Sequence, residues 1–151
     1  MLPLWILSNK TLIINYLIHY YQKNHLNMEK IIFICGIYNI GFAIFHTGFW
    51  KIFHWNQDLK KLRFENKAII QILNIQIIYF FLFTAIICFA FPDELLNTAI
   101  GKWFLAGNSI FWILRTINQF IFLRSKHFMV HVLTLIFILG SFLFVFPLIL
   151  N

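Results

Sequence analysis

The residues of this sequence that could do chemistry are polar side chains set inside long apolar segments. Arg115 is the one charged residue that lies away from a tail, a connection or a segment end. An arginine near the middle of a membrane costs about 2.5–3.5 kcal/mol to insert, so such residues usually face other helices and have specific partners. No acidic residue falls within the long apolar segments to neutralise it. Its expected chemistry is that of a fixed cation that binds an anion or a carbonyl oxygen.

Neutral polar side chains are expected to gather around this arginine. Helical spacing places Asn39 and His46 on one face of the first long segment. It likewise places Gln71 and Asn74, three residues apart, on one face of the second. All of them except Asn39 fall in the same half of the membrane when the segments are aligned. The predicted ligand-binding residues are Arg115, His46, Asn74, Gln71, Asn118, Gln119 and Asn39.

Two other interpretations of the same residues stay open. In the first, Arg115 extends along its helix to the lipid headgroups, and its neutral neighbours hydrogen-bond one helix to the next. In the second, the polar residues line a path for protons or ions. Only the first of these two places the guanidinium group in the headgroup layer, away from His46 and Asn74.

The composition places these segments in a membrane. Of the 151 residues, 61% are hydrophobic and only 11% are charged, with 12 basic and five acidic side chains. Soluble domains carry about 25% charged residues, and disordered chains lack this much apolar surface. A surface that faces water cannot be built from so few charges. We therefore expect an integral membrane protein.

Four segments are predicted to cross the membrane as an all-α, up-and-down four-helix bundle. Three of them run for 20 to 24 residues without a charge, which matches the thickness of a bilayer. The remaining segment contains Lys102 and Arg115 but is otherwise apolar and aromatic. The predicted spans are about 31–50, 68–91, 100–123 and 128–150.

The charges of the connections predict the orientation of the bundle. Residues 51–67 and the connection that contains Arg124 and Lys126 together hold seven basic residues, whereas the connection between them is net acidic through Asp93 and Glu94. Cytoplasmic loops are enriched in Lys and Arg, so the two basic connections are expected in the cytoplasm and both termini outside. The expected location is the inner (plasma) membrane of a bacterial cell.

Residues 1–27 are treated apart from the predicted membrane domain, 28–151. They contain no basic region before an apolar run and no small-residue cleavage site, so a signal peptide is not indicated. Met28 stands directly before the first long segment, as a native start would. Residues 1–27 are therefore expected to be an N-terminal tail or a mis-assigned upstream start, with an amphipathic helix on the outer leaflet as the alternative.

Histidines and cysteines give weaker indications. His46 and His131 are predicted at matching depth on two segments and could ligate a haem from two sides, although interfacial histidines are more commonly solvated. The sequence contains no metal-ligand motif, so no metal site and no other cofactor is predicted. Cys35 and Cys88 are both expected one turn from the outer surface, as free thiols that pack like small hydrophobic residues, with a disulfide as the alternative.

A resemblance lies in two stretches, YNIGFAIFHTGFWKIFHW (38–55) and NKAIIQILN (66–74). They resemble small uncharacterised four-helix membrane proteins of bacteria, and the layout over residues 29–123 is similar to DoxX-like and related four-helix families. The resemblance implies a location and an architecture. It carries over no functional residue, because no catalytic motif defines it.

The expected function is that of a multi-pass membrane protein that binds an anionic or polar lipophilic ligand in the cytoplasmic half of its bundle. The alternative is a structural or accessory membrane subunit whose polar residues lock helix packing. A membrane redox enzyme that uses His46 or the thiols is the third candidate. Phosphate-binding glycine loops, nucleophile elbows and paired carboxylates are absent from the sequence, so an enzyme is not favoured.

The expected partners follow from the same features. The basic residues of 51–67 are expected to contact anionic membrane lipid rather than nucleic acid. A small lipophilic or anionic ligand, a second copy of the chain and another membrane protein are the further candidates.

Overall fold

The structure, a computed structural model, describes residues 4–123 and 128–150, and its elements in these ranges are all helical. Four long helices form the body of the fold: α1 (Leu4–Thr47), α4 (Phe64–Ala90), α6 (Ala99–Phe122) and α7 (Phe128–Leu150). Short elements connect them: α2 (Phe49–Ile52), α3 (Trp55–Asp58) and the 3-10 turn η1 (Leu59–Lys61) between α1 and α4, and α5 (Pro92–Asn97) between α4 and α6.

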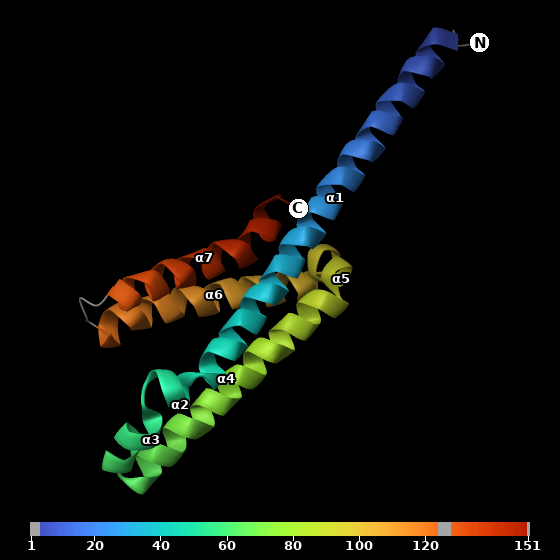
Figure 1. The fold of residues 1–151 in the computed structure, drawn as a ribbon. Helices are drawn as coiled ribbons and strands as arrows, with labels where there is room; N and C mark the ends of the chain where they lie inside the picture. The colour runs from blue at the N-terminus through green and yellow to red at the C-terminus, as the bar shows by residue number, and fades with distance from the viewer. Residues whose placement is uncertain (1–3, 124–127, 151) are drawn as a thin grey trace.

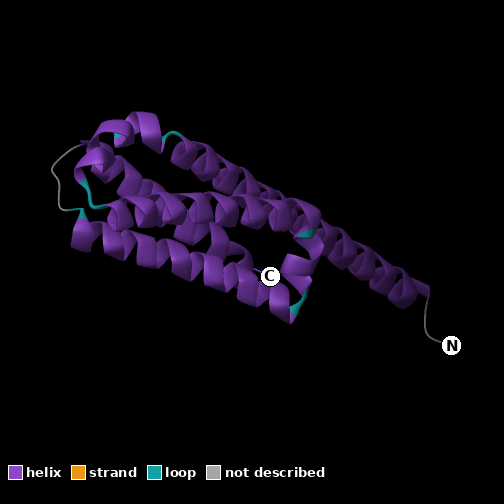
Figure 2. Cartoon of the chain, turned by 90° about the horizontal axis from the view of Figure 1, so that it is seen from below, coloured by secondary structure: helices purple, strands orange, loops and turns teal. Residues whose placement is uncertain are grey.

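The long helices pack as two antiparallel pairs. α1 lies along α4, and α6 lies along α7, and the two pairs cross each other (Figure 1). The N-terminal part of α1 projects beyond the rest of the molecule, whereas the end of α7 lies beside α1 (Figures 1 and 2). Short connections of this kind favour antiparallel neighbours, as in other helix bundles.

Three helices in the described ranges are long and apolar enough to cross a membrane. They comprise Leu12–Thr47, Phe64–Ala90 and Phe128–Leu150. At 24 residues α6 has sufficient length, but Lys102, Arg115 and its amide side chains make it more polar than these three. The expected all-helical fold is thus confirmed for the described residues, with three membrane-capable helices, whereas a fourth crossing and the orientation stay predictions.

The outward surface of the long helices agrees with this assignment. Large apolar side chains are exposed along each of them, including Phe33 of α1, Tyr79 of α4, Ile110 of α6 and Leu135 of α7. Soluble monomers rarely expose continuous apolar surface of this extent. An apolar surface of this extent is stable in contact with the lipid tails of a membrane.

The predicted helix ends lie close to the observed ones for the last three long helices. α7 covers the described residues of the predicted range, 128–150, and α6 begins and ends one residue before the predicted 100–123. α4 begins four residues before the predicted 68, and α1 ends at Thr47, three residues before the predicted end. The first long helix differs most, because α1 runs without a break from Leu4 through Met28. A native start at Met28 stays a prediction.

The connection between α4 and α6 is built from local capping signals. Pro92 occupies the first turn of α5, followed by Asp93 and Glu94, which complement the positive end of the helix dipole. The Thr98 hydroxyl then caps α6 by accepting a hydrogen bond from the Gly101 amide at 3.0 Å. The acidic connection thus forms a separate short helix rather than the start of α6.

One cluster ties the projecting part of α1 to this connection. His25 Nε2 lies 3.1 Å from Asp93 Oδ1, and His25 Nδ1 lies 3.5 Å from Glu29 Oε1. The Asn97 amide also donates to Asp93 Oδ1 at 2.7 Å. A residue that precedes Met28 therefore takes part in a tertiary contact.

Aromatic side chains from all four long helices meet in the core. The Trp112 ring of α6 has its centroid 4.6 Å from that of Phe42, 5.5 Å from that of Phe81 and 5.8 Å from that of Phe137. These partners belong to α1, α4 and α7, and all four side chains are buried. We call these four residues the aromatic core, and it joins the two helix pairs.

Gly101 permits a close approach of α5 to α6. A Cβ atom at this position would lie 2.5 Å from Leu95 Cα and would also collide with the Glu94 carbonyl oxygen. These are backbone atoms, which cannot move aside as the end of a flexible side chain can. Gly107, in the same helix, has no neighbouring atom within 4 Å of the equivalent position.

Replacing these two glycines by alanine should therefore have opposite effects on stability. We expect Gly101→Ala to lower the free energy of unfolding by about 1–3 kcal/mol through overpacking. Gly107→Ala should leave it unchanged or raise it by up to about 1 kcal/mol through helix propensity. Thermal unfolding of the purified protein in detergent measures both, and equal midpoints for the two variants would contradict the close packing of α5 on α6.

Candidate functional site

A polar pair joins α1 to α4 at the end of α1. His46 Nδ1 donates to Asn74 Oδ1 at 2.8 Å, and the Asn74 amide returns a hydrogen bond of 3.1 Å to the His46 carbonyl oxygen. Asn74 is 5% exposed. The His46 ring also stacks on Phe49, with ring centroids 4.2 Å apart. Both functional groups of the Asn74 amide are thus used in holding the two helices together.

Arg115 lies half-buried between α6 and α7. Its Nη1 donates to Gln119 Oε1 at 3.4 Å, and its Cζ atom lies 4.5 Å from the centroid of the Phe137 ring. The ion pairs found among the described residues involve other cations, so no carboxylate neutralises this guanidinium there. A long hydrogen bond to a neutral amide and a contact with an aromatic face leave most of its N–H donors available.

Gln119 connects Arg115 to α7. Its side chain is 1% exposed, and its Nε2 donates to the Val130 carbonyl oxygen at 3.1 Å, with Thr134 Oγ1 at 3.5 Å. The amide therefore bonds across α6 and α7 while its oxygen faces the guanidinium. Because the oxygen and the nitrogen of this buried amide are both hydrogen-bonded, Gln119 fixes the position of Arg115.

The two polar groups lie on the same side of the aromatic core. His46 follows Phe42 by one helical turn in α1, and Arg115 follows Trp112 by nearly one turn in α6. The structure thus places four of the predicted residues on one side of the aromatic core, as two bonded pairs: His46 with Asn74, and Arg115 with Gln119.

The other three predicted residues lie elsewhere. Asn118 is exposed. Gln71 donates to the Lys67 carbonyl oxygen of its own helix at 3.1 Å and lines a separate cavity. Asn39 is fully buried beyond the aromatic core, where its amide donates to the Cys35 carbonyl oxygen at 2.8 Å.

Sequence reasoning missed part of the polar interior. Thr84 is fully buried within the apolar run of α4, and its hydroxyl has no hydrogen-bond partner among the described residues. Three other buried atoms also have no hydrogen-bond partner among the described residues: Oδ1 of Asn39, Oδ1 of Asn108 and Nε1 of Trp112. The contribution of Phe137 to the arginine site was also missed, because one phenylalanine among many in an apolar helix carries no signal.

The expected haem ligands have different surroundings. His131 is exposed at the start of α7, whereas His46 uses Nδ1 to bind Asn74. A bis-histidine haem therefore stays a prediction. A different group, not expected from the sequence, is able to hold a metal ion: one nitrogen of His25 and one oxygen each of Glu29 and Asp93 lie within 4.8 Å of one another.

The cysteines are buried free thiols. Cys35 Sγ lies 3.5 Å from the Leu143 carbonyl oxygen, to which it donates a weak hydrogen bond. Cys88 is 1% exposed. This agrees with the expectation that both pack as small hydrophobic residues.

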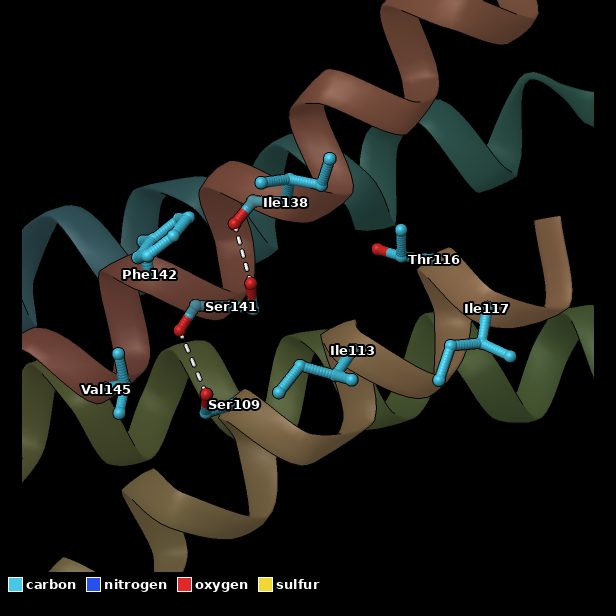
Figure 3. Close-up of a pocket in the computed structure, with 8 residues that line it drawn as sticks. All are labelled: Ser109, Ile113, Thr116, Ile117, Ile138, Ser141, Phe142 and Val145. Atoms are coloured by element: carbon cyan, nitrogen blue, oxygen red, sulfur yellow. Dashed lines mark hydrogen bonds between the residues drawn. The ribbon is translucent and has the colours of Figure 1, made fainter. Parts of the chain in front are cut away.

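A groove of about 390 Å³ runs between α6 and α7 on the surface (Figure 3). Its two serines are engaged in hydrogen bonds: Ser109 Oγ donates to the Ser141 carbonyl oxygen at 2.9 Å, and Ser141 Oγ donates to the Ile138 carbonyl oxygen at 2.7 Å. The remaining lining is mostly Ile, Phe and Val. A groove of this kind suits an apolar chain and offers little to an anionic group.

Comparison with protein-family models, with curated proteins and with solved structures found no match for this chain. The function is therefore inferred from the residues and their geometry.

The contrast between a buried asparagine and an exposed one yields a test of the α1–α4 pair. Asn74→Ala removes the bonds to His46, so we expect the free energy of unfolding to fall by about 1–2 kcal/mol, as for other hydrogen bonds between membrane helices. Asn118→Ala makes the same chemical change at an exposed position and should stay within about 0.5 kcal/mol of the parent. Thermal unfolding in one detergent compares them, and equal losses would contradict the pairing described above.

Proposed function

We propose that the chain is a multi-pass membrane protein that binds the anionic group of a lipophilic ligand at Arg115. The observation that carries the proposal is a half-buried guanidinium with no acidic partner among the described residues. Carboxylates and phosphates match the fork of N–H donors that arginine presents. A cation kept inside an apolar bundle is typical of a binding or transport function.

The surroundings of Arg115 support an anion rather than a cation as the guest. The His46 ring lies on the same side of the aromatic core, where its Nδ1–H is engaged with Asn74 Oδ1. Phe137 covers one face of the guanidinium, which leaves its edge for hydrogen bonding. Gln119 holds the arginine from the other side through a bond of 3.4 Å. The Arg115 guanidinium thus presents its N–H donors beside an apolar surface, which are the properties that a lipophilic anion requires.

The proposed topology makes α6 the fourth crossing. α6 packs along α7, which is itself long and apolar enough to span a membrane. Its polar residues Asn108, Trp112 and Gln119 are turned into the bundle and buried, while Ile110, Ile113 and Ile117 are exposed. A helix with this division is able to lie in lipid although its mean hydropathy is lower. The basic connection after α1 then faces the cytoplasm, and both termini lie outside an inner membrane.

A structural or accessory subunit is the second candidate. The mutual bonds of His46 and Asn74 and the bond of Gln119 to the Val130 carbonyl oxygen lock helices together. In this alternative Arg115 contributes to the same locking through Gln119. The two candidates differ in what the removal of Arg115 does to stability.

Replacing Arg115 by leucine separates the two candidates. If Arg115 binds a ligand, Arg115→Leu should leave the thermal midpoint of unfolding unchanged or raise it. The same change should weaken the binding of the anion by about 2–5 kcal/mol. The measurement is native mass spectrometry of the detergent-purified protein, which reports co-purified ligand and oligomeric state together. A sharply lower melting temperature in the absence of any bound ligand would support the structural candidate instead.

Lys102→Leu is the matched control for this change. Lys102 belongs to the same helix but is exposed near its start. We expect it to leave both the bound ligand and the thermal midpoint unchanged. An equal loss of ligand in the two variants would show that overall charge, and not the position of Arg115, determines retention.

A further inference from the structure

The connection between α1 and α4 encloses a cavity of about 300 Å³ that lies apart from Arg115. This volume is at the lower end of the range for small-molecule sites, about 300–1,000 Å³. The lining residues are Trp50, Trp55, Asn56, Leu59, Lys60, Lys67 and Gln71. Its walls thus combine two indoles, two ammonium groups and two amides.

A chain reversal at His54 builds this cavity. His54 adopts a left-handed backbone conformation, with φ of 51°, between α2 and α3. The reversal brings the Trp55 ring against Trp50, with centroids 5.3 Å apart, and against Phe49, at 5.5 Å. Leu59 then anchors the segment, because it is only 6% exposed although its neighbours are exposed. The cavity is therefore formed by packed side chains and not by a loose loop.

The charge of the lining selects the class of ligand. Lys60 and Lys67 bring two positive charges to the wall, and no acidic residue is among the lining residues. The ion pairs of this connection are formed by its other cations, Lys61 with Asp58 and Arg63 with Glu65. A cationic guest such as a choline group would meet two like charges, so an anion is favoured despite the two indoles.

The surroundings place the cavity at a membrane surface. Exposed apolar side chains lie close to it in the chain: Ile52 and Phe53 before it, and Leu62 and Phe64 after it, with Phe64 at 81%. Both helices that it joins, α1 and α4, include a segment long and apolar enough to span. Tryptophan pairs beside lysines are typical of the headgroup layer.

From these observations we infer that the cavity binds the phosphodiester group of an anionic phospholipid, with Lys60 and Lys67 holding the phosphate. The indoles and Leu59 pack against the glycerol end of the lipid, and the Asn56 amide adds a hydrogen-bond donor. The site shares no lining residue with the Arg115 site and does not depend on the function proposed for that residue. An inorganic phosphate shares the same chemistry, so the test separates the two sources.

The test compares two double variants of the full chain in detergent. Lys60→Gln with Lys67→Gln removes the two charges of the cavity, whereas Lys51→Gln with Lys61→Gln removes two exposed charges of the same connection that do not line it. Native mass spectrometry measures the binding of a short-chain phosphatidylglycerol, of a phosphatidylcholine with the same chains, and of inorganic phosphate. Thermal unfolding of each variant is recorded alongside.

We expect the parent to prefer phosphatidylglycerol over phosphatidylcholine and to bind inorganic phosphate only weakly. Each lysine near an anionic lipid contributes about 1 kcal/mol, so the Lys60 and Lys67 double variant should bind phosphatidylglycerol about 25-fold more weakly. The Lys51 and Lys61 double variant should stay within about threefold of the parent, because charges outside the cavity act only through solvent. Because Arg115 is itself proposed to bind a lipophilic anion, the two double variants are also compared in the Arg115→Leu background, where we expect the same difference between them.

Three outcomes would overturn the inference. Equal weakening in the two double variants would show a diffuse attraction to the basic connection. Inorganic phosphate that binds as tightly as phosphatidylglycerol would assign the cavity to a soluble anion. If the Lys60 and Lys67 double variant does not fold, Lys60→Arg with Lys67→Arg keeps the charge, and failure of this folded variant to bind phosphatidylglycerol would likewise exclude the site.

Discussion

The contact of Trp112 with one aromatic ring from each of the other long helices is the interaction on which the arrangement depends. α1 with α4, and α6 with α7, form separate antiparallel pairs, and the aromatic core is where the pairs meet. In lipid no hydrophobic effect drives helices together, so close packing and interhelical hydrogen bonds must hold them. Gly140 contributes here, since a Cβ at that position would lie 2.9 Å from the Trp112 ring. The close approach at Gly140 of α7 thus involves the Tyr38 ring of α1 as well as this indole.

The polar groups on one side of that core have different roles. Within each pair they are bonded to one another: Asn74 to His46 in the first, and Gln119 to the Val130 carbonyl oxygen in the second. Arg115 differs, because its one side-chain hydrogen bond is long and leads to an amide that already joins α6 to α7. On this side of the core the Asn74 and Gln119 amides are hydrogen-bonded, whereas the Arg115 guanidinium has no acidic partner among the described residues. This asymmetry is the reason for preferring a ligand over a purely structural role.

The two ends of the molecule carry different chemistry. At one end the reversal at His54 folds the basic connection into a cavity that holds Lys60 and Lys67. At the other, His25 lies between Glu29 and Asp93 and ties the projecting part of α1 to α5. The connection rich in lysine and the acidic connection thus lie at opposite ends of the bundle, and the orientation that the positive-inside rule predicts from them stays a prediction.

The sequence by itself indicated a membrane protein and predicted where most of its helices lie, because the length of an apolar run and its charge are local properties. It therefore predicted the bounds of α6 within one residue and a helix throughout the described residues 128–150. It also found the polar residues, but not their grouping. Gln119 is buried while its neighbour Asn118 is exposed, and Gln71 faces a different cavity from Asn74. The rotation of each helix about its axis decides these cases, and only packing against distant helices fixes that rotation.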